Sequence, residues 1–122
     1  MAAPNLVNVT SILGKTIGAA LGTSVTTDIL TCASDKVLKI NSIIVANIDG
    51  SNSADVTVSF YDATDTTRYR LASTVAVPAD STLVVIGKDS PIYLEEGDRI
   101  SSGASASSDL EIVISYEELD DA

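Results

Sequence analysis

The 122-residue sequence lacks histidine and tryptophan altogether and contains a single cysteine, Cys32. The missing histidine excludes a Ser-His-Asp triad, a Cys-His dyad and an imidazole-bound metal. One cysteine can form neither an internal disulfide nor a zinc site that needs several thiolates. Basic residues are also scarce, because 7 Lys and Arg face 17 Asp and Glu and leave a net charge of −10. Since phosphate contacts need a basic surface, we expect no nucleic-acid partner.

Long apolar runs are missing as well, and we expect no secretory leader at the N-terminus. The apolar stretches are shorter than the ~20 residues that a membrane-spanning helix needs, so we expect no membrane partner. Residues 1–13 contain no basic residue, unlike the start of a signal peptide. We therefore expect the chain to be made and to fold in a cytoplasm.

The residues that are abundant favour β-structure. Val, Ile and Thr number 12 each, and Gln is absent, so strand formers outnumber the residues that usually cover helices. Alternating apolar runs recur about every ten residues and are separated by clusters of Gly, Asp, Asn, Ser or Pro. The spacing predicts an all-β fold, an antiparallel sandwich or barrel of eight to nine strands. The predicted strands are residues 13–21 (with a short helix as the alternative), 25–32, 37–48, 56–61, 68–77, 82–86, 92–94, 99–104 and 110–116.

The length fits a single domain with three parts. Residues 1–24 form an N-terminal arm plus the first strand, residues 25–118 form the sandwich, and residues 119–122 form an acidic tail. We expect residues 1–11 to be extended, because Pro4 disfavours a helix. We also expect the N-terminal arm, residues 1–24, to dock on a neighbour, because extended arms add strands or thread between neighbours. The acidic residues from Glu117 to Asp121 are expected to be exposed.

Three strands carry apolar residues on both faces, which a lone sandwich does not need because its outer faces are usually polar. Residues 38, 40, 44, 46 and 48 share one parity in the third predicted strand, and two apolar residues oppose them. The same conflict occurs in residues 82–86 and 110–116. We therefore predict a subunit interface in a homo-oligomer. Its residues are Ile43, Val45, Val84, Ile86 and Val113.

Several short motifs resemble parts of enzyme active sites, but none of them supports an enzymatic function. Gly14-Lys15-Thr16 resembles the end of a phosphate-binding loop, but Val9 stands where that loop needs its first glycine. The carboxylates of Asp62 with Asp65, and of Glu95 with Glu96, occur in turns, where they are solvated rather than tuned for hydrolysis. We assign no catalytic residue and no cofactor, and we predict that the chain is not an enzyme.

The remaining polar clusters also fit structural roles. The loop at 49–55 offers oxygen donors for calcium, but it lacks the ligand spacing of an EF-hand and consists of the residues that turns use. We assign no metal ligand. Cys32 is predicted to be a buried, unreactive side chain. Arg68 and Arg70 are predicted to form cross-strand or intersubunit ion pairs.

Three stretches of the chain share a pattern with known proteins. They are residues 39–47 followed by a loop and 56–62, residues 83–86 leading to 91–100, and residues 109–118. Together they resemble small virion proteins of tailed bacteriophages, especially marine and cyanobacterial phages, over roughly residues 36–118. The resemblance is one of sequence pattern and includes no catalytic motif. It implies a β-sandwich or jelly roll that serves as a structural part of the virion.

Proteins of this kind commonly form trimers on the capsid lattice as decoration or cement proteins. The resemblance therefore implies a homotrimer that binds the major capsid protein or other virion proteins, is assembled in the host cytoplasm and is located in the virion. A neck, collar or tail-fibre component is the alternative within this class. An alternative of another class is a carbohydrate- or receptor-binding module that uses the loops at 49–55, 62–67 and 95–98.

Overall fold

The computed structural model describes residues 9–121 and the side chains of residues 11–120. Within these residues the chain forms nine strands and no helix, so this part of the chain has no helix that could cross a membrane. All nine predicted strands are present, and residues 13–20 belong to a strand rather than a helix. The strands are β1 (Val9–Ala20), β2 (Asp28–Thr31), β3 (Lys36–Asn47), β4 (Ala54–Asp62), β5 (Thr67–Val77), β6 (Thr82–Ile86), β7 (Ile92–Leu94), β8 (Arg99–Ala104) and β9 (Leu110–Asp121).

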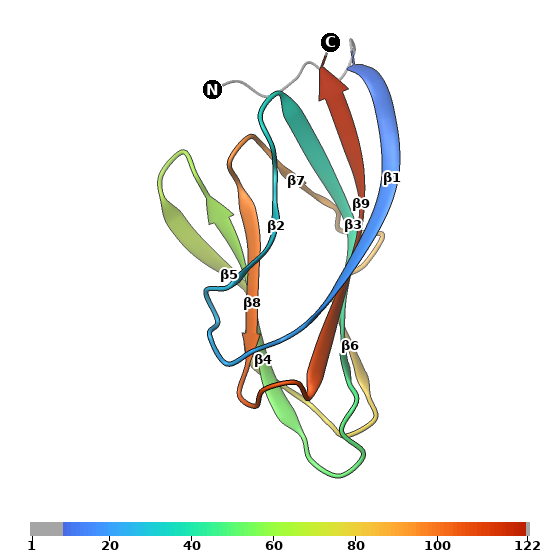
Figure 1. Ribbon diagram of the computed structural model, residues 1–122, viewed down its shortest axis with the longest axis vertical. Helices are drawn as coiled ribbons and strands as arrows, with labels where there is room; N and C mark the ends of the chain where they lie inside the picture. Colours follow the sequence, from blue (N-terminus) through green and yellow to red (C-terminus); the bar gives the residue numbers. More distant parts are fainter. Residues whose placement is uncertain (1–8, 122) are drawn as a thin grey trace.

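The strands form two sheets that lie face to face (Figure 1). Sheet A has the order β1-β9-β3-β6, with β7 also paired to β3, and sheet B has the order β2-β8-β4-β5. Every pairing is antiparallel. The chain crosses from one sheet to the other between most consecutive strands, which is the connectivity of a double-sheet jelly roll. The predicted all-β, jelly-roll-like sandwich is therefore confirmed.

The core lies between the two sheets and is almost entirely aliphatic. Each sheet contributes alternate residues, and complete burial of one such side chain stabilises the fold by about 1.5–3 kcal/mol. The fully buried residues of the central strands are Leu38, Ile40, Ile43, Val45, Val56, Val58, Ile100, Ile112 and Ile114.

A β-bulge in β3 changes which residues face this core. Ile40 is paired with Tyr116 and Ser42 with Ser115, so Asn41 is an extra residue in the ladder. An extra residue reverses the alternation of the side chains that follow it. Before the bulge the even-numbered residues point inward, and after it the odd-numbered residues do. The prediction that positions 38 to 48 of one parity share a face is therefore wrong beyond Asn41.

The acidic end of the sequence is not a free tail. β9 continues to Asp121 between β1 and β3, and Leu119 is buried. The carboxylate of Glu118 lies 3.1 Å from Lys15 Nζ, and that of Asp120 lies 2.9 Å from Lys36 Nζ. The prediction of an exposed tail is wrong for residues 117–120, which are partly or fully buried because they lie in β9 between β1 and β3. The docking arm predicted for residues 1–24 lies outside the described residues over 1–8, and from Val9 to Ala20 it is β1, which pairs with β9 of the same chain. Its docking on a neighbour stays a prediction.

Candidate interaction surfaces

The outer face of sheet A carries an apolar row that crosses β6, β3, β9 and β1. Val84 on β6 is the register partner of Ile44 on β3, Ile44 is paired with Val113 on β9, and Val113 is paired with Gly18 on β1. The exposed fraction is 60% for Val84 and 36% for Val113. We call these four residues the apolar row. The inner face of the same sheet is already filled by the core, so the row has no intramolecular role.

A shallow hollow lies at the β1 end of the apolar row. Its volume is about 280 Å³, and it is lined by residues 18–20 of β1 and residues 111–113 of β9. A Cβ atom at position 18 would come within 3.9 Å of the Val113 side chain. The glycine therefore leaves space beside Val113, and a side chain from another molecule can enter there.

The structure divides the five predicted interface residues into two groups. Val84 and Val113 point outward, as predicted. Ile43, Val45 and Ile86 are buried inside the subunit core, so their assignment to an interface is wrong. The physical reason is a bulge on each strand: Asn41 reverses β3, and Val85 is the extra residue between the pairs Ile43–Ile86 and Ile44–Val84.

The other two members of the row are not predicted by the sequence pattern. The parity of β3 places Ile44 on the core side, because the bulge before it leaves no distinct signal in an all-aliphatic stretch. Gly18 reads in the sequence as a residue that weakens its strand. A glycine within a strand also indicates close approach of another group, and that signal points to the hollow.

A second surface feature is an aromatic groove between β5, the edge strand of sheet B, and β7 of sheet A. It has a volume of about 160 Å³ and is lined by Phe60, Tyr69, Leu71, Ile92 and Tyr93. The Phe60 and Tyr69 rings are stacked, with their centroids 6.5 Å apart. About half of the Tyr69 and Tyr93 side chains is exposed.

Three of the carboxylates that suggested hydrolysis, those of Asp62, Asp65 and Glu96, accept hydrogen bonds from backbone N–H groups, and Glu96 accepts from the Asp35 N–H at 2.8 Å. Asp62 accepts from the Thr64 N–H at 3.0 Å, and Asp65 accepts from the Thr67 N–H at 3.1 Å. The Tyr69 hydroxyl also donates to Asp65, at 3.0 Å, and this carboxylate raises the pKa of that hydroxyl.

The loops at 62–67 and 95–98 are joined by a buried carboxylate. Asp98 Oδ1 accepts from the Ala63 N–H at 2.9 Å, and Oδ2 accepts from the Glu95 N–H at 3.0 Å. The loop at 49–55 follows the other end of β3, so the three loops do not form one site. In that loop Asp49 accepts from the Ser51 and Asn52 N–H groups, which lower its pKa. No group of three His, Cys, Asp or Glu residues suited to a metal occurs among the described residues.

Two further sequence features belong to the framework of the fold. Gly14, Lys15 and Thr16 lie in the middle of β1, where the backbone is paired to β9 and cannot wrap around a phosphate. Cys32 is buried, as predicted, and its thiol donates to the Lys36 carbonyl at 3.2 Å. Burial raises the pKa of the Cys32 thiol to about 11, so it is an unreactive thiol at neutral pH.

Neither a family model nor a curated protein matches the chain. Among solved structures, it is similar to a protein of Bacillus endospore appendages, a family of disulfide-linked pili. The identity is 13%, the TM-score is 0.51, and the match covers 92% of this chain and 90% of that one. It also matches the CBM22-1 xylan-binding domain of Paenibacillus barcinonensis Xyn10C, with 12% identity and a TM-score of 0.35 over 94% and 90% of the two chains.

A third match is to the CBM22-1–GH10 modules of Clostridium thermocellum xylanase 10B. It has 10% identity and a TM-score of 0.30 and covers 94% of this chain and 27% of that one. The likeness to the pilus protein supports the β-sandwich fold, and the weaker likenesses carry no functional argument. The absence of enzymatic activity stays a prediction.

Proposed function

We propose that the chain is a structural subunit of a tailed-bacteriophage virion, a capsid decoration or cement protein that binds its neighbours through the outer face of sheet A. The observation that carries the proposal is the apolar row, with Val84 and Val113 exposed on a sheet whose inner face is already packed. Exposed apolar rows on a sandwich mark protein–protein contacts. The sequence resemblance to phage virion proteins supports the virion as the assembly in which this contact is made.

The mechanism of such a subunit is attachment. Each copy buries its apolar row against a neighbouring copy or a capsid subunit, and the hollow at Gly18 accepts a side chain from that partner. A single contact of this size is weak, but many copies on a regular lattice bind collectively through avidity. The expected outcome is a homotrimer that bridges major capsid proteins and stabilises the lattice.

Binding to purified empty capsids of the parent phage tests the proposal. The protein should saturate capsids at a fixed stoichiometry and raise the temperature at which they break. The double variant Val84→Asp, Val113→Asp should lose uptake by at least about tenfold, because a carboxylate in an apolar contact costs more than the ~1.4 kcal/mol that tenfold requires.

Val75→Asp is the matched control, because Val75 has the same exposed fraction as Val113, 36%, but lies on β5 of sheet B. It should bind capsids like the wild type. No uptake of the wild-type protein, or equal uptake of the double variant, would exclude the decoration function. Immunogold labelling of whole virions separates a capsid position from the neck, collar or tail-fibre alternative.

The aromatic groove favours a second candidate, a carbohydrate- or receptor-binding module. Tyr69 and Tyr93 present half-exposed rings at the groove, and the loops at 62–67 and 95–98 are tied together by Asp98. Such a module needs a concave apolar surface with a few polar groups. The groove has these properties, whereas the loop at 49–55 is not part of it.

A glycan array distinguishes this candidate from the first. A binding module should give reproducible hits that Tyr93→Ala abolishes and that Ile48→Ala, an exposed apolar change away from the groove, leaves intact. An array without hits, together with capsid uptake, would leave the groove without a ligand and support the structural function.

A further inference from the structure

All three arginines of the chain lie on the outer face of sheet B, although they come from strands far apart in the sequence. Arg68 on β5 and Arg99 on β8 are both register partners of Tyr61 on β4, which lies between them. In the next row Arg70 is paired with Ser59. We call the surface made of Arg68, Arg70, Arg99 and Tyr61 the arginine face.

The side chains of this face are held in place by one another. The guanidinium carbons of Arg99 and Arg68 lie 4.6 Å and 5.0 Å from the centroid of the Tyr61 ring, within the range of a cation–π interaction. Arg70 Nη1 donates to the Ser59 hydroxyl at 2.9 Å. A guanidinium has five N–H donors, so these contacts orient the groups, and Arg70 keeps donors without an acceptor among the described residues.

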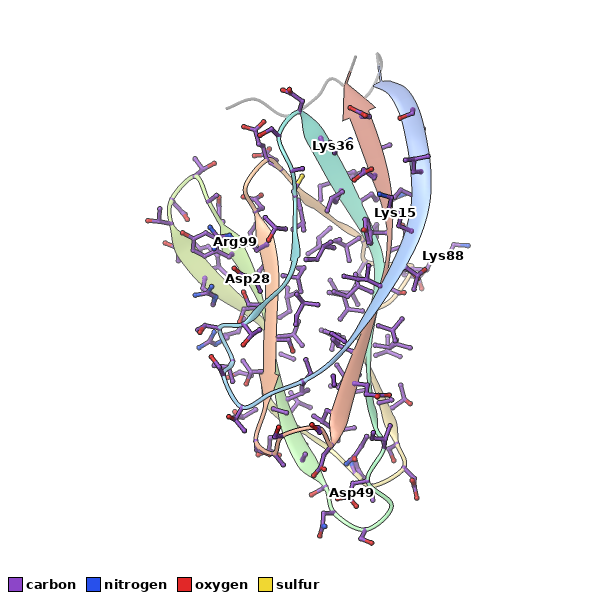
Figure 2. All side chains as sticks on the ribbon, in the orientation of Figure 1. Lys15, Asp28, Lys36, Asp49, Lys88 and Arg99 are labelled. Carbon is purple, nitrogen blue, oxygen red and sulfur yellow. The ribbon has the colours of Figure 1, made fainter. Side chains whose placement is uncertain are left out.

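A single carboxylate partly neutralises the face. Asp28 lies 3.2 Å from Arg99 and 3.9 Å from Arg68 (Figure 2 shows Asp28 beside Arg99). Among the described side chains, no carboxylate forms an ion pair with Arg70. The face therefore keeps an excess of positive charge, while the rest of the chain has four lysines against sixteen carboxylates. A second copy of the chain is an acidic partner.

One end of the sandwich supplies a matching acidic surface. The loops at 48–55, 78–81 and 105–109 contain four aspartates and no basic residue. Two backbone hydrogen bonds join the loops: the Asp80 N–H donates to the Asp49 carbonyl at 3.3 Å, and the Ile48 N–H donates to the Asp109 carbonyl at 2.9 Å. We call this surface the acidic end. Its aspartates are Asp49, Asp55, Asp80 and Asp109.

The two surfaces cannot meet within one molecule. Asp49 lies at the bottom of the molecule in Figure 2, whereas Asp28 and Arg99 lie in its upper half. A contact between them therefore joins two copies. Because it joins unlike surfaces, it is heterologous and either closes into a ring or continues as a chain of subunits.

We propose that the acidic end of one copy binds the arginine face of the next, which gives the assembly a second contact besides the apolar row. This inference rests on the proposed function in one respect, the meeting of copies of the chain. Charge complementarity identifies the occupant as a second copy, and Arg70 is the residue whose donors the partner's carboxylates complete.

Charge reversal in two partners tests the contact. Sedimentation of the wild-type protein should show association at low salt that weakens at least about tenfold in 0.5 M salt, where the screening length is only a few ångströms. Arg70→Glu should lose the low-salt association, and so should Asp80→Lys. An equimolar mixture of these two variants should recover it, because each supplies the surface that the other can bind.

Lys88→Glu is the control, because it makes the same charge change at an exposed lysine outside the arginine face. It should associate like the wild type. Thermal unfolding of each variant excludes a folding defect as the cause of lost association. Full association of Arg70→Glu, failure of the mixture to recover, or a wild-type protein that stays monomeric at low salt would overturn the proposal.

Two more outcomes distinguish the arginine contact from a polyanion site and from the apolar row. A wild-type protein that stays monomeric and binds heparin through Arg70 would replace the second copy with a polyanion and overturn the inference. If Val84→Asp, Val113→Asp loses capsid uptake while Arg70→Glu keeps its self-association and its uptake, the proposed function stands and the arginine contact fails.

Discussion

At Gly103 the connection between β1 and β2 passes very close to sheet B. A Cβ atom at this position would lie 2.5 Å from the Ser24 carbonyl oxygen and 2.7 Å from the Val25 Cα. Both neighbours are backbone atoms, and the Ala104 N–H holds this connection in place by donating to the Gly22 carbonyl at 2.8 Å. The connection cannot move away without breaking this hydrogen bond to β8.

Gly103→Ala should therefore destabilise the fold strongly. Overpacking against fixed atoms typically costs ~1–3 kcal/mol, and the neighbouring backbone here places the expected loss in unfolding free energy at the upper end or above it. Gly14→Ala is the matched control, since Gly14 is also a strand glycine and has nothing within 4 Å of an added Cβ. Urea unfolding measures both variants. Equal stability of the two would show that the connection is free to move.

Cys32 makes the stability depend on pH in the alkaline range. Its folded-state pKa of about 11 is above the ordinary value of 9.0, chiefly because of burial. The folded state holds this proton more tightly than the unfolded state, so the contribution to stability is complete below pH 9 and is lost as the pH rises through 11. Urea unfolding across this range should show a steeper decline for the wild type than for Cys32→Ala. Parallel declines would assign the effect to other groups.

At the scale of the element, the strand pattern of the sequence predicts the fold class and the positions of the strands, but not the order in which they pair. Clusters of turn residues separate the apolar runs so regularly that each of the nine strands can be recognised in the sequence. The inner and outer faces are predictable where a strand is regular, as in β4, where Val56 and Val58 are buried. They are not predictable in β3 and β6, because Ile and Val occupy both sides of each bulge and the composition does not mark the extra residue.

Asn41 is the residue on which the face assignment of β3 depends. Its deletion would place the residues after it on the opposite face, moving Ile43 and Val45 out of the core unless Leu38 and Ile40 move out instead. Each large buried side chain removed from the core costs ~2–5 kcal/mol, so the variant should not fold. Circular dichroism and one-dimensional NMR would detect this.

Ser53 provides the control deletion, because it lies in the exposed loop between β3 and β4. Loop tips of this kind tolerate insertions and deletions, so this variant should remain folded. A folded Asn41 deletion with a native NMR spectrum would contradict the role given to the bulge.

At the scale of the whole molecule, the sequence could predict that an apolar outer surface exists but not its composition. Val84 and Val113 are recognisable because they are apolar residues on the side of a strand that a lone sandwich leaves polar. The sequence places Arg68 and Arg70 on one face of a strand, but it does not predict that Arg99 lies beside them. Arg99 is near Arg68 because β8 and β5 both pair with β4. Such neighbours depend on strand order, which a single sequence does not specify.

The outward direction of the apolar row gives a stability prediction that separates assembly from folding. Val84→Asp, Val113→Asp should change the unfolding free energy of the isolated subunit little, because exposed substitutions usually stay within about 0.5 kcal/mol each. Ile112→Asp, in the core on β9, should prevent folding. Thermal unfolding of the wild type and the two variants compares them. A double variant as unstable as Ile112→Asp would mean that the row belongs to the core.

The pairing of Val9 with Asp121 has a consequence for how the subunit carries force. The two residues are register partners on neighbouring antiparallel strands, so both ends of the described chain lie together. Tension applied between them would break the hydrogen bonds of the β1–β9 ladder one pair after another. It would not load all of these hydrogen bonds at once in shear. Pulled by its ends the sandwich is therefore compliant. The proposed attachment through the outer face of sheet A does not pull on these two ends, so it leaves the ladder unloaded.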